Sequence, residues 1–209
     1  MSVDSLRDEV RQLAQMAENH AFGWMQAHMP SAEDLLVEIQ EMVGVYADTA
    51  ALLTADWYDE LYPDSSYSAV MDDDLADEKI VNVANWVHAG PQLPENRMRV
   101  AANRIVFDAA RRTVLVNAQS EGVALARDEE AKCCNTCIAS ATLGPKERRG
   151  RSDDVEQFFH PSCEGLFVPV RQGVWEPPSH AYEWRERVKA ARLAGNTDTE
   201  RIASWLDSH

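Results

Sequence analysis

The four cysteines of this chain lie in one short stretch together with a histidine, and their spacing suits a metal ion. The stretch reads Cys-Cys-Asn-Thr-Cys at 133–137 and Phe-Phe-His-Pro-Ser-Cys at 158–163. Cys134-x-x-Cys137 places two thiolates on one turn, and His160-x-x-Cys163 adds a nitrogen donor and a third thiolate at the same spacing. Zinc prefers such a tetrahedral set of sulfur and nitrogen ligands. We therefore predict one zinc ion held by Cys134, Cys137, His160 and Cys163.

Two alternatives stay open at this stage. Cys133 could replace Cys134 as a ligand, although Cys133-x-x-x-Cys137 fits a zinc knuckle less well. The cysteines could also be free buried thiols beside an unrelated surface histidine. If zinc is bound, four protein ligands leave no position for a substrate or an activated water, so the zinc would be structural.

Motifs that would indicate catalysis are missing from the sequence. It contains no Gly-x-Gly-x-x-Gly, no phosphate-binding lysine motif, no Gly-x-Ser-x-Gly and no His-Glu-x-x-His. A zinc deaminase would need a His-x-Glu pair and an open coordination position, and the chain has no His-x-Glu. We expect no enzymatic activity.

Composition indicates a globular protein with an uneven distribution of charge. The chain has 209 residues, 45% of them hydrophobic, and no apolar run long enough to cross a membrane, so we expect no membrane association. The N-terminus lacks the order of a signal peptide, and clustered cysteines in a reducing compartment favour metal over disulfides.

Residues 1–95 carry 19 acidic and 3 basic side chains, whereas residues 96–209 carry 16 and 17. The acidic half is either simply solvated or faces a basic protein partner.

The first half of the chain reads as long amphipathic helices. An apolar stripe predicts a helix from residue 3 to about Pro30, and Ser31 with Asp34 forms a capping-box pattern at the start of a second one. That helix should run to residue 61 with a strict four-three seam, which either packs on the chain's own helices or pairs with another molecule. A short helix over 75–88 and a long, deeply buried one over 94–119 should follow. The predicted seam consists of Leu35, Ile39, Met42, Tyr46, Ala50, Leu53, Trp57 and Leu61.

The long helix carries three arginines at a spacing of seven, which raises the question of nucleic-acid binding. Arg97, Arg104 and Arg111 would lie on one helix face, and residues 146–151 form a second basic cluster. Either could contact phosphates, but an internally paired or solvated arginine stripe explains the spacing better, because the chain lacks the basic balance that nucleic-acid binders usually show. We expect any DNA contact to be weak and non-specific.

The second half should form a small mixed module around the metal. Apolar runs at 123–127 and 166–170 predict two short strands, and residues 135–143 predict a short helix behind the first ligand pair. Ser179 should cap a helix to residue 193, and a last helix should span 198–206. The predicted fold is mainly α with a small zinc-bound α+β module. Its expected domains are a helical domain at 1–121, a zinc-binding module at 122–175 and a C-terminal helical segment at 176–209.

In this order of elements the chain resembles a known family. The segment Ala-Asp-Trp-Tyr-Asp-Glu-Leu at 55–61, the arginine-studded helix, Cys-x-x-Cys, Phe-His-x-x-Cys and Val-Pro-Val resemble the MuF-like minor capsid proteins of tailed phages that infect actinobacteria. The resemblance covers about residues 31–170. It departs from the family at Gly165, where relatives often have a further cysteine, and at 141–145, where they have a glycine-and-tyrosine segment.

The resemblance implies a structural head protein that acts in phage head assembly. Its expected partners are the portal and other head proteins, its metal ligands would be the four residues above, and its place would be the capsid interior or portal vertex, with the host cytoplasm as the site of assembly. Two rival functions are a zinc-stabilised DNA-binding or regulatory protein and a capsid-maturation hydrolase with an unrecognised active site.

Overall fold

The structure is a computed structural model that describes residues 1–28, 30–72, 77–89, 93–146, 159–160, 163–171 and 176–209. It is mainly helical with one small two-stranded sheet, which confirms the predicted fold class. The chain divides into two compact units, Met1–Asn117 and Ala118–His209. The three-part division at residues 121 and 175 stays a prediction. No helix in the described part of the chain has the length and apolarity that crossing a membrane requires.

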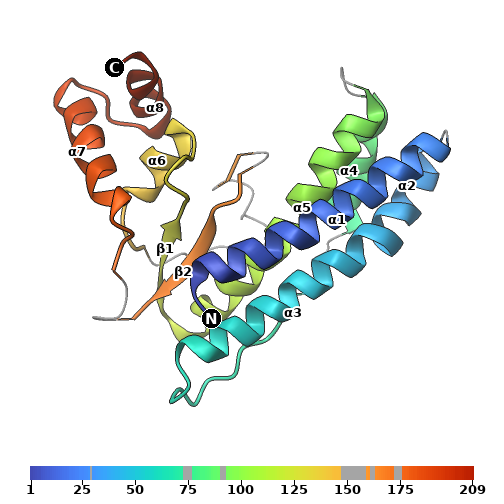
Figure 1. Ribbon diagram of the computed structural model, residues 1–209, viewed down its shortest axis with the longest axis horizontal. Helices are drawn as coiled ribbons and strands as arrows, with labels where there is room; N and C mark the ends of the chain where they lie inside the picture. Colours follow the sequence, from blue (N-terminus) through green and yellow to red (C-terminus); the bar gives the residue numbers. More distant parts are fainter. Residues whose placement is uncertain (29, 73–76, 90–92, 147–158, 161–162, 172–175) are drawn as a thin grey trace. The chain divides into compact units, whose positions relative to one another are not determined.

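Unit 1 is built from helices whose small residues let them pack closely. α1 (Val3–Ala27) lies beside α3 (Gly44–Leu61) (Figure 1), and α2 (Ala32–Glu38) contacts α4 (Asp77–Ala89). α5 (Pro94–Glu121) begins in this unit and ends in the second. Alanines on the facing sides of α1 and α3 allow a short distance between the helix axes. The buried alanines are Ala14, Ala17 and Ala21 on α1, and Ala47, Ala50 and Ala51 on α3.

The predicted second helix is interrupted by a π-helical turn, η1 (Ile39–Val43), between α2 and α3. Its start is as predicted, because Ser31 and Asp34 exchange both hydrogen bonds of a capping box. The wider turn inserts one residue into the helical repeat. As a result Ala47 and Thr54 are buried in place of the predicted Tyr46 and Leu53, which are only half-buried. The seam packs within unit 1, against α1 and α4.

Buried polar side chains join the segments of unit 1. Arg97 is 1% exposed and donates from Nε to the Val87 carbonyl at 2.7 Å, so it satisfies a carbonyl in the last turn of α4. Asn117, which is fully buried, donates from Nδ2 to the Val70 carbonyl at 2.7 Å and accepts from the Val70 amide at 2.9 Å. Its Oδ1 also accepts from the Tyr67 hydroxyl at 2.7 Å. Asn117 therefore attaches the segment after α3 to α5.

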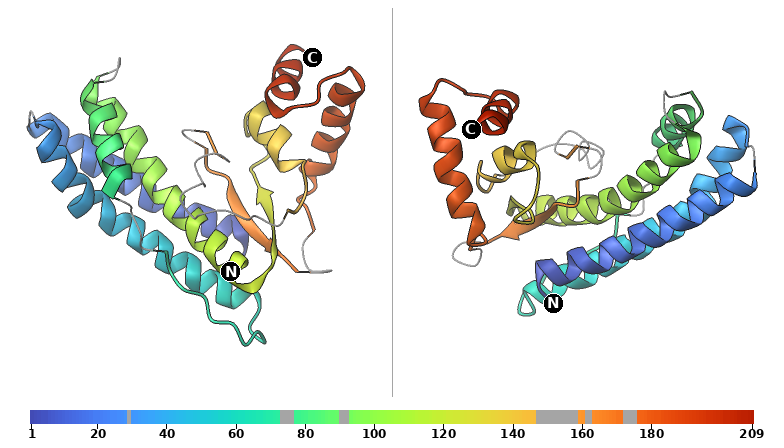
Figure 2. Two further views of the ribbon diagram at one scale, coloured as in Figure 1. Left: turned by 180° about the vertical axis from the view of Figure 1, so that it is seen from behind. Right: turned by 45° about the horizontal axis from the view of Figure 1, so that its top comes forward.

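In its described residues, unit 2 combines the sheet with three helices that follow one another in the second half of the chain. β1 (Ala124–Asp128) pairs antiparallel with β2 (Leu166–Val170) in a register that places Ala126 opposite Val168, as the two apolar runs predicted. α6 (Asn135–Ala141), α7 (His180–Leu193) and α8 (Thr199–Ser208) lie side by side (Figure 2). They share one apolar cluster. Its buried members are Ile138, Ala139, Trp184, Val188, Ala191, Ile202 and Leu206.

Helix ends in unit 2 show where local sequence signals succeed and fail. Gly122, at φ 68°, ends α5 in a Schellman motif in which the Val123 amide donates to the Ala118 carbonyl at 2.8 Å. Asp198 caps α8 by accepting from the Arg201 amide at 2.9 Å. Ser179 precedes α7 as predicted but makes no side-chain capping bond, because its own backbone is already helical. That part of the prediction was wrong.

Candidate metal centre

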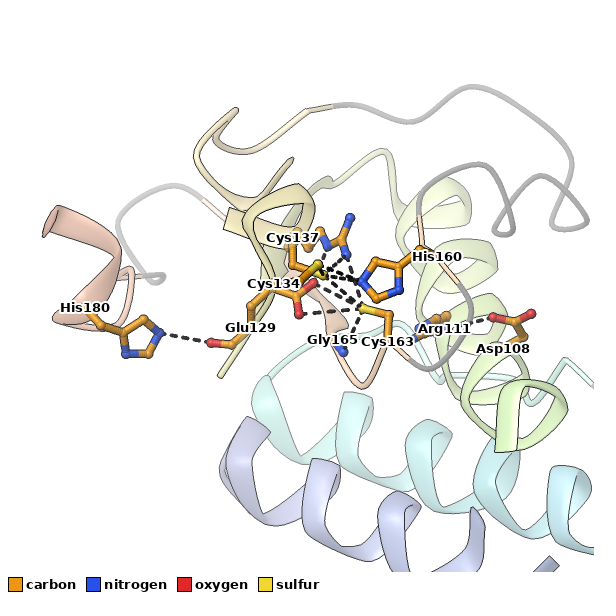
Figure 3. A network of polar contacts seen from close by, with 10 residues as sticks. Asp108, Arg111, Glu129, Cys134, Cys137, His160, Cys163, Gly165 and His180 are labelled. Atoms are coloured by element: carbon orange, nitrogen blue, oxygen red, sulfur yellow. Dashed lines mark hydrogen bonds and ion pairs between the residues drawn. The ribbon is translucent and has the colours of Figure 1, made fainter. Parts of the chain in front are cut away.

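The antiparallel sheet explains why two ligand pairs so far apart in the sequence meet. In two antiparallel strands the end of one strand lies beside the start of the other. Asp128 at the end of β1 pairs with Leu166 at the start of β2. The chain leaves β1 toward α6, where Cys134 is the N-cap and Cys137 lies in the first turn. His160 and Cys163 lie on the segment that leads into β2. All four side chains therefore converge at one end of the sheet (Figure 3).

The four predicted ligands form a connected group of donor atoms. His160 Nε2 lies 3.0 Å from the sulfurs of both Cys134 and Cys137, and these two sulfurs are 3.6 Å apart. Cys163 joins the group through Cys137, with 3.6 Å between their sulfurs. Zinc–sulfur bonds of about 2.3 Å at tetrahedral angles would separate two sulfurs by about 3.8 Å. The sulfur–sulfur distances fit such an ion. The distances from His160 Nε2 to the two sulfurs are shorter than those around a tetrahedral zinc ion.

Donor atoms in the described residues fall into two overlapping sets of three. One set is Cys134, Cys137 and His160; the other is Cys137, Cys163 and Glu129, and within each set the donor atoms lie within 4.8 Å of one another. Cys137 belongs to both. The group could hold a metal ion, and Glu129 is a possible donor that the sequence analysis did not identify.

Cys133 and Cys134 differ in their surroundings. Cys134 is exposed and contributes its sulfur to a donor set, whereas Cys133 belongs to neither set and packs against the apolar cluster of α6, α7 and α8. Cys134 begins α6 as its N-cap, so its side chain projects beside that of Cys137 one turn later. This arrangement favours Cys134 over Cys133, and the assignment of the ligand itself stays a prediction.

The donor atoms line a cavity of about 230 Å³ in unit 2. Its wall includes Glu130, Lys132 and Glu164 as well as the cysteines and His160. A metal ion could reach the sulfurs from this side without displacement of the core. The buried side of the site is closed by Cys137 and Cys163, which are 2% and 5% exposed.

Without a metal the central cysteine holds its proton. A side-chain hydrogen bond with Cys133 raises the pKa of Cys137, as do burial of the thiol and the negative charge of Glu129; the hydrogen bond with Cys163 and the charge of Arg127 act in the opposite direction. The net effect keeps Cys137 a neutral thiol at neutral pH. Metal binding must therefore release this proton, and metal affinity will rise with pH.

Two buried charged residues beside the sulfurs were missed by the sequence analysis. Arg127 and Glu129 form an ion pair, with side chains 4% and 2% exposed. The only sequence signal was their position at the end of a predicted strand, where charged residues usually face solvent. Arg127 also stacks over the Phe159 ring at 4.2 Å, which closes one side of the site.

The predicted arginine stripe on α5 lies inside unit 1. Arg111 is 1% exposed and donates to Asp108 at 2.9 Å, Arg97 is buried against Val87, and Arg104 contacts Asp108 at 3.4 Å. The internally paired alternative is therefore the observed one. In the basic cluster at 146–151 only Lys146 belongs to the described residues, and it pairs through its backbone with Leu125.

The fold and the donor group define a mainly helical protein with a candidate metal centre beside a small sheet. Residues 2–191 match the family model described as VG15 protein, and the chain belongs to this family. The family is a phage family, so the chain is a phage protein. No curated protein and no solved structure gave a significant match.

Proposed function

We propose that the chain is a structural minor head protein of a tailed phage, related to the MuF-like proteins, with one structural zinc ion and no catalytic activity. The observation that carries the proposal is the group of three cysteine sulfurs and one imidazole nitrogen at the end of the sheet, in a chain of a phage family. Four such ligands are typical of zinc sites that stabilise a fold.

The donor group supports a structural role better than a catalytic one. Cys134, Cys137, His160 and Cys163 would fill a tetrahedral ion, and no coordination position would remain for a substrate. The ligands also join two segments that are far apart in the sequence, α6 and the segment that leads into β2. Cross-linking of those segments is the contribution that a bound zinc would make.

The surface charge of unit 1 supports a basic head protein, most simply the portal, as its partner. The unit contains 20 acidic and 8 basic side chains. Among the residues of the unit whose burial the structure describes, 16 are acidic and 7 are basic; four of these arginines and two of these aspartates are buried, which leaves 14 acidic and 3 basic side chains and a charge of −11. The electrostatic field of this negative charge accelerates association with a basic protein surface and repels nucleic acid. We place the protein at the portal vertex or inside the capsid, after assembly in the host cytoplasm.

The first experiment tests the metal. Protein purified without chelator should contain one zinc per chain by elemental analysis. Cys137→Ser should lose it, because Cys137 belongs to both donor sets. Cys134→Ser should also lose zinc, and Cys133→Ser should keep it. Zinc-free parent protein would contradict the proposed centre, and loss of zinc from Cys133→Ser alone would show that Cys133 is the ligand.

The second experiment tests the partner. Portal protein of the same phage should retain the full chain at low salt and release it at high salt. Replacing Glu9, Glu41 and Asp56, which are exposed in unit 1, by lysine should weaken retention. The matched control makes the same change in charge at Glu183, Glu186 and Glu200 of unit 2. Equal loss in both triple variants, or no binding to any head protein at low salt, would count against the proposed role.

The two rival functions have their own measurements. With Arg97 and Arg111 buried, a DNA-binding role would depend on the cluster at 146–151, and we expect gel shifts to show only weak, salt-sensitive binding. A capsid-maturation hydrolase would change the size of head proteins on co-expression. We expect no such change.

A further inference from the structure

The guanidinium of Arg127 contacts two of the proposed ligand sulfurs at once. Its Nη2 donates to Cys137 Sγ and to Cys163 Sγ, each at 3.2 Å. The residue is on β1, and its side chain is 4% exposed. Because a buried guanidinium is always charged, it stabilises negative charge on both sulfurs.

Glu129 completes this arrangement from the other side of Arg127. Arg127 Nε donates to Glu129 Oε1, and both carboxylate oxygens lie 3.7 Å from Cys163 Sγ. The backbone of Glu129 is held in turn, because its carbonyl oxygen lies 3.0 Å from His180 Nε2 at the start of α7. The carboxylate therefore has two possible roles: a direct metal ligand, or the partner that orients Arg127.

The contacts of Arg127 decide between these roles. Glu129 Oε1 already accepts a hydrogen bond from Arg127 Nε, so the carboxylate that would bind a metal is held by the guanidinium. The sulfur of Cys137 also lies 3.6 Å from Cys134 Sγ and 3.0 Å from His160 Nε2, and these residues line the cavity. Glu129 is then better suited to hold Arg127 than to bind the metal.

Gly165 makes room for the carboxylate. A Cβ atom at this position would lie 2.0 Å from Glu129 Oε1 and 2.3 Å from its Cδ, which is closer than any real contact. The amide of Gly165 also donates to Cys163 Sγ at 3.4 Å. A side chain at 165 would therefore expel Glu129 from its place and remove the partner that orients Arg127.

We propose that Arg127, Glu129 and Gly165 form a positioning unit for the metal centre: Arg127 binds two ligand sulfurs, Glu129 orients Arg127 without binding the metal, and Gly165 admits Glu129. This inference rests on the proposed zinc site. A divalent zinc ion with three thiolates and a neutral imidazole has a net charge of −1, and the guanidinium balances it at the two least exposed sulfurs. Partners of this kind typically change metal affinity by about 10- to 100-fold.

The test measures zinc affinity of the full chain by competition with a chromophoric chelator. Arg127→Gln should weaken binding by about 10- to 100-fold. Arg127→Lys should recover only part of the loss, because an ammonium keeps the charge but cannot span two sulfurs and a carboxylate. Glu129→Gln and Gly165→Ala should each weaken binding in the same direction. The matched control is Arg171→Gln, which breaks another ion pair of unit 2, with Glu121, and should leave affinity unchanged.

Cobalt substitution supplies a readout that general destabilisation would not imitate. Glu129→Gln should keep the sulfur-to-cobalt charge-transfer and visible absorption bands of the parent, because no ligand is lost. His160→Ala should change them. Altered bands in Glu129→Gln with unaltered bands in His160→Ala would overturn the proposal and make Glu129 the ligand.

The outcomes separate this inference from the proposed function. If the parent binds zinc but Arg127→Gln and Gly165→Ala both bind it within threefold of the parent, the positioning unit is refuted and the zinc site stands. If the parent binds no zinc, both are refuted. Should Arg127→Gln fail to fold, Gly165→Ala decides, since it leaves Arg127 in the chain.

Discussion

Asn117 should be one of the residues on which unit 1 depends most. It is fully buried, and its amide group makes four hydrogen bonds, three of them to Tyr67 and Val70 and one from Nδ2 to the Thr113 carbonyl at 2.6 Å. Asn117→Ala removes all four and leaves the groups on residues 67–70 without partners. A buried group that loses its partner costs about 1–3 kcal/mol.

The solvent exposure of the groups that lose their partners determines how much stability Asn117→Ala costs. Val70 is 57% exposed, so water can partly replace its lost bonds, and the low end of the range applies to each of the three groups. The expected loss is about 3 kcal/mol, which corresponds to about a hundredfold change in an opening equilibrium. The segment after α3 should separate from α5 before the helices themselves unfold.

Hydrogen exchange gives a direct assay. The Asp72 amide donates to Thr113 Oγ1 at 3.1 Å next to the Asn117 contacts, and its exchange should accelerate about a hundredfold in Asn117→Ala. Asn103→Ala on the same helix is the control, because Asn103 makes one bond to Glu18 and its buried Oδ1 has no partner. Less than tenfold acceleration at Asp72, or an equal effect in the control, would refute the reasoning.

Three further predictions concern the metal, α8 and the cap of α2. Chelation of the metal should expose amides around β1, α6 and β2 to hydrogen exchange. Most of the helical signal in circular dichroism should persist, because the helices of unit 1 bury their own core. Complete loss of helicity would contradict this prediction. Ile202→Ala should destabilise unit 2 by about 2–4 kcal/mol in urea unfolding, since Ile202 is 2% exposed against α6, whereas Leu193→Ala, at 83% exposure, should change little. Hydrogen bonds from the Ser31 amide and hydroxyl lower the pKa of Asp34 in the folded protein. The cap therefore stabilises α2 fully at pH values above the unfolded pKa of about 3.9. This stabilisation is lost as the pH falls through the lower pKa of the folded state. Hydrogen exchange of the Leu35 amide, followed as the pH is lowered in the parent and in Asp34→Asn, would measure this loss of stability.

Local patterns predicted the helices and strands but not the phase of the second helix. The seam residues Leu35, Ile39 and Met42 are buried as expected, although Ile39 and Met42 already lie in the π-helical turn. Beyond η1 Ala50 and Trp57 are buried as predicted, but Ala47 and Thr54 are buried in place of Tyr46 and Leu53. The four-three spacing assumes an uninterrupted α-helix, and packing of this segment against α1 and α4 determines where the wider turn lies. That information is not local.

The site was predictable to the extent that residue type alone signals its chemistry. Pairs of cysteine and histidine at short spacing suggest a metal site, so Cys134, Cys137, His160 and Cys163 could be selected from sequence, and the structure brings their side chains together. Arg127 and Glu129 could not, since charged residues after a strand are normally solvated and only the tertiary structure buries them. Gly165 was noticed as a departure from a resemblance, and its contact with Glu129 now supplies a physical reason for it.

The separation of the two strands along the chain has a consequence for how unit 2 folds. Pairing β1 with β2 closes a loop over residues 129–165, at an entropy cost of about 3 kcal/mol, and five residue pairs give little in return until the rest of the unit is formed. A metal ion that joins Cys137 to His160 closes a shorter loop inside the first. The ends of the strands are then already close when they pair. We therefore expect metal to bind before the sheet forms, so that the supply of metal during synthesis would set the rate at which the second unit matures.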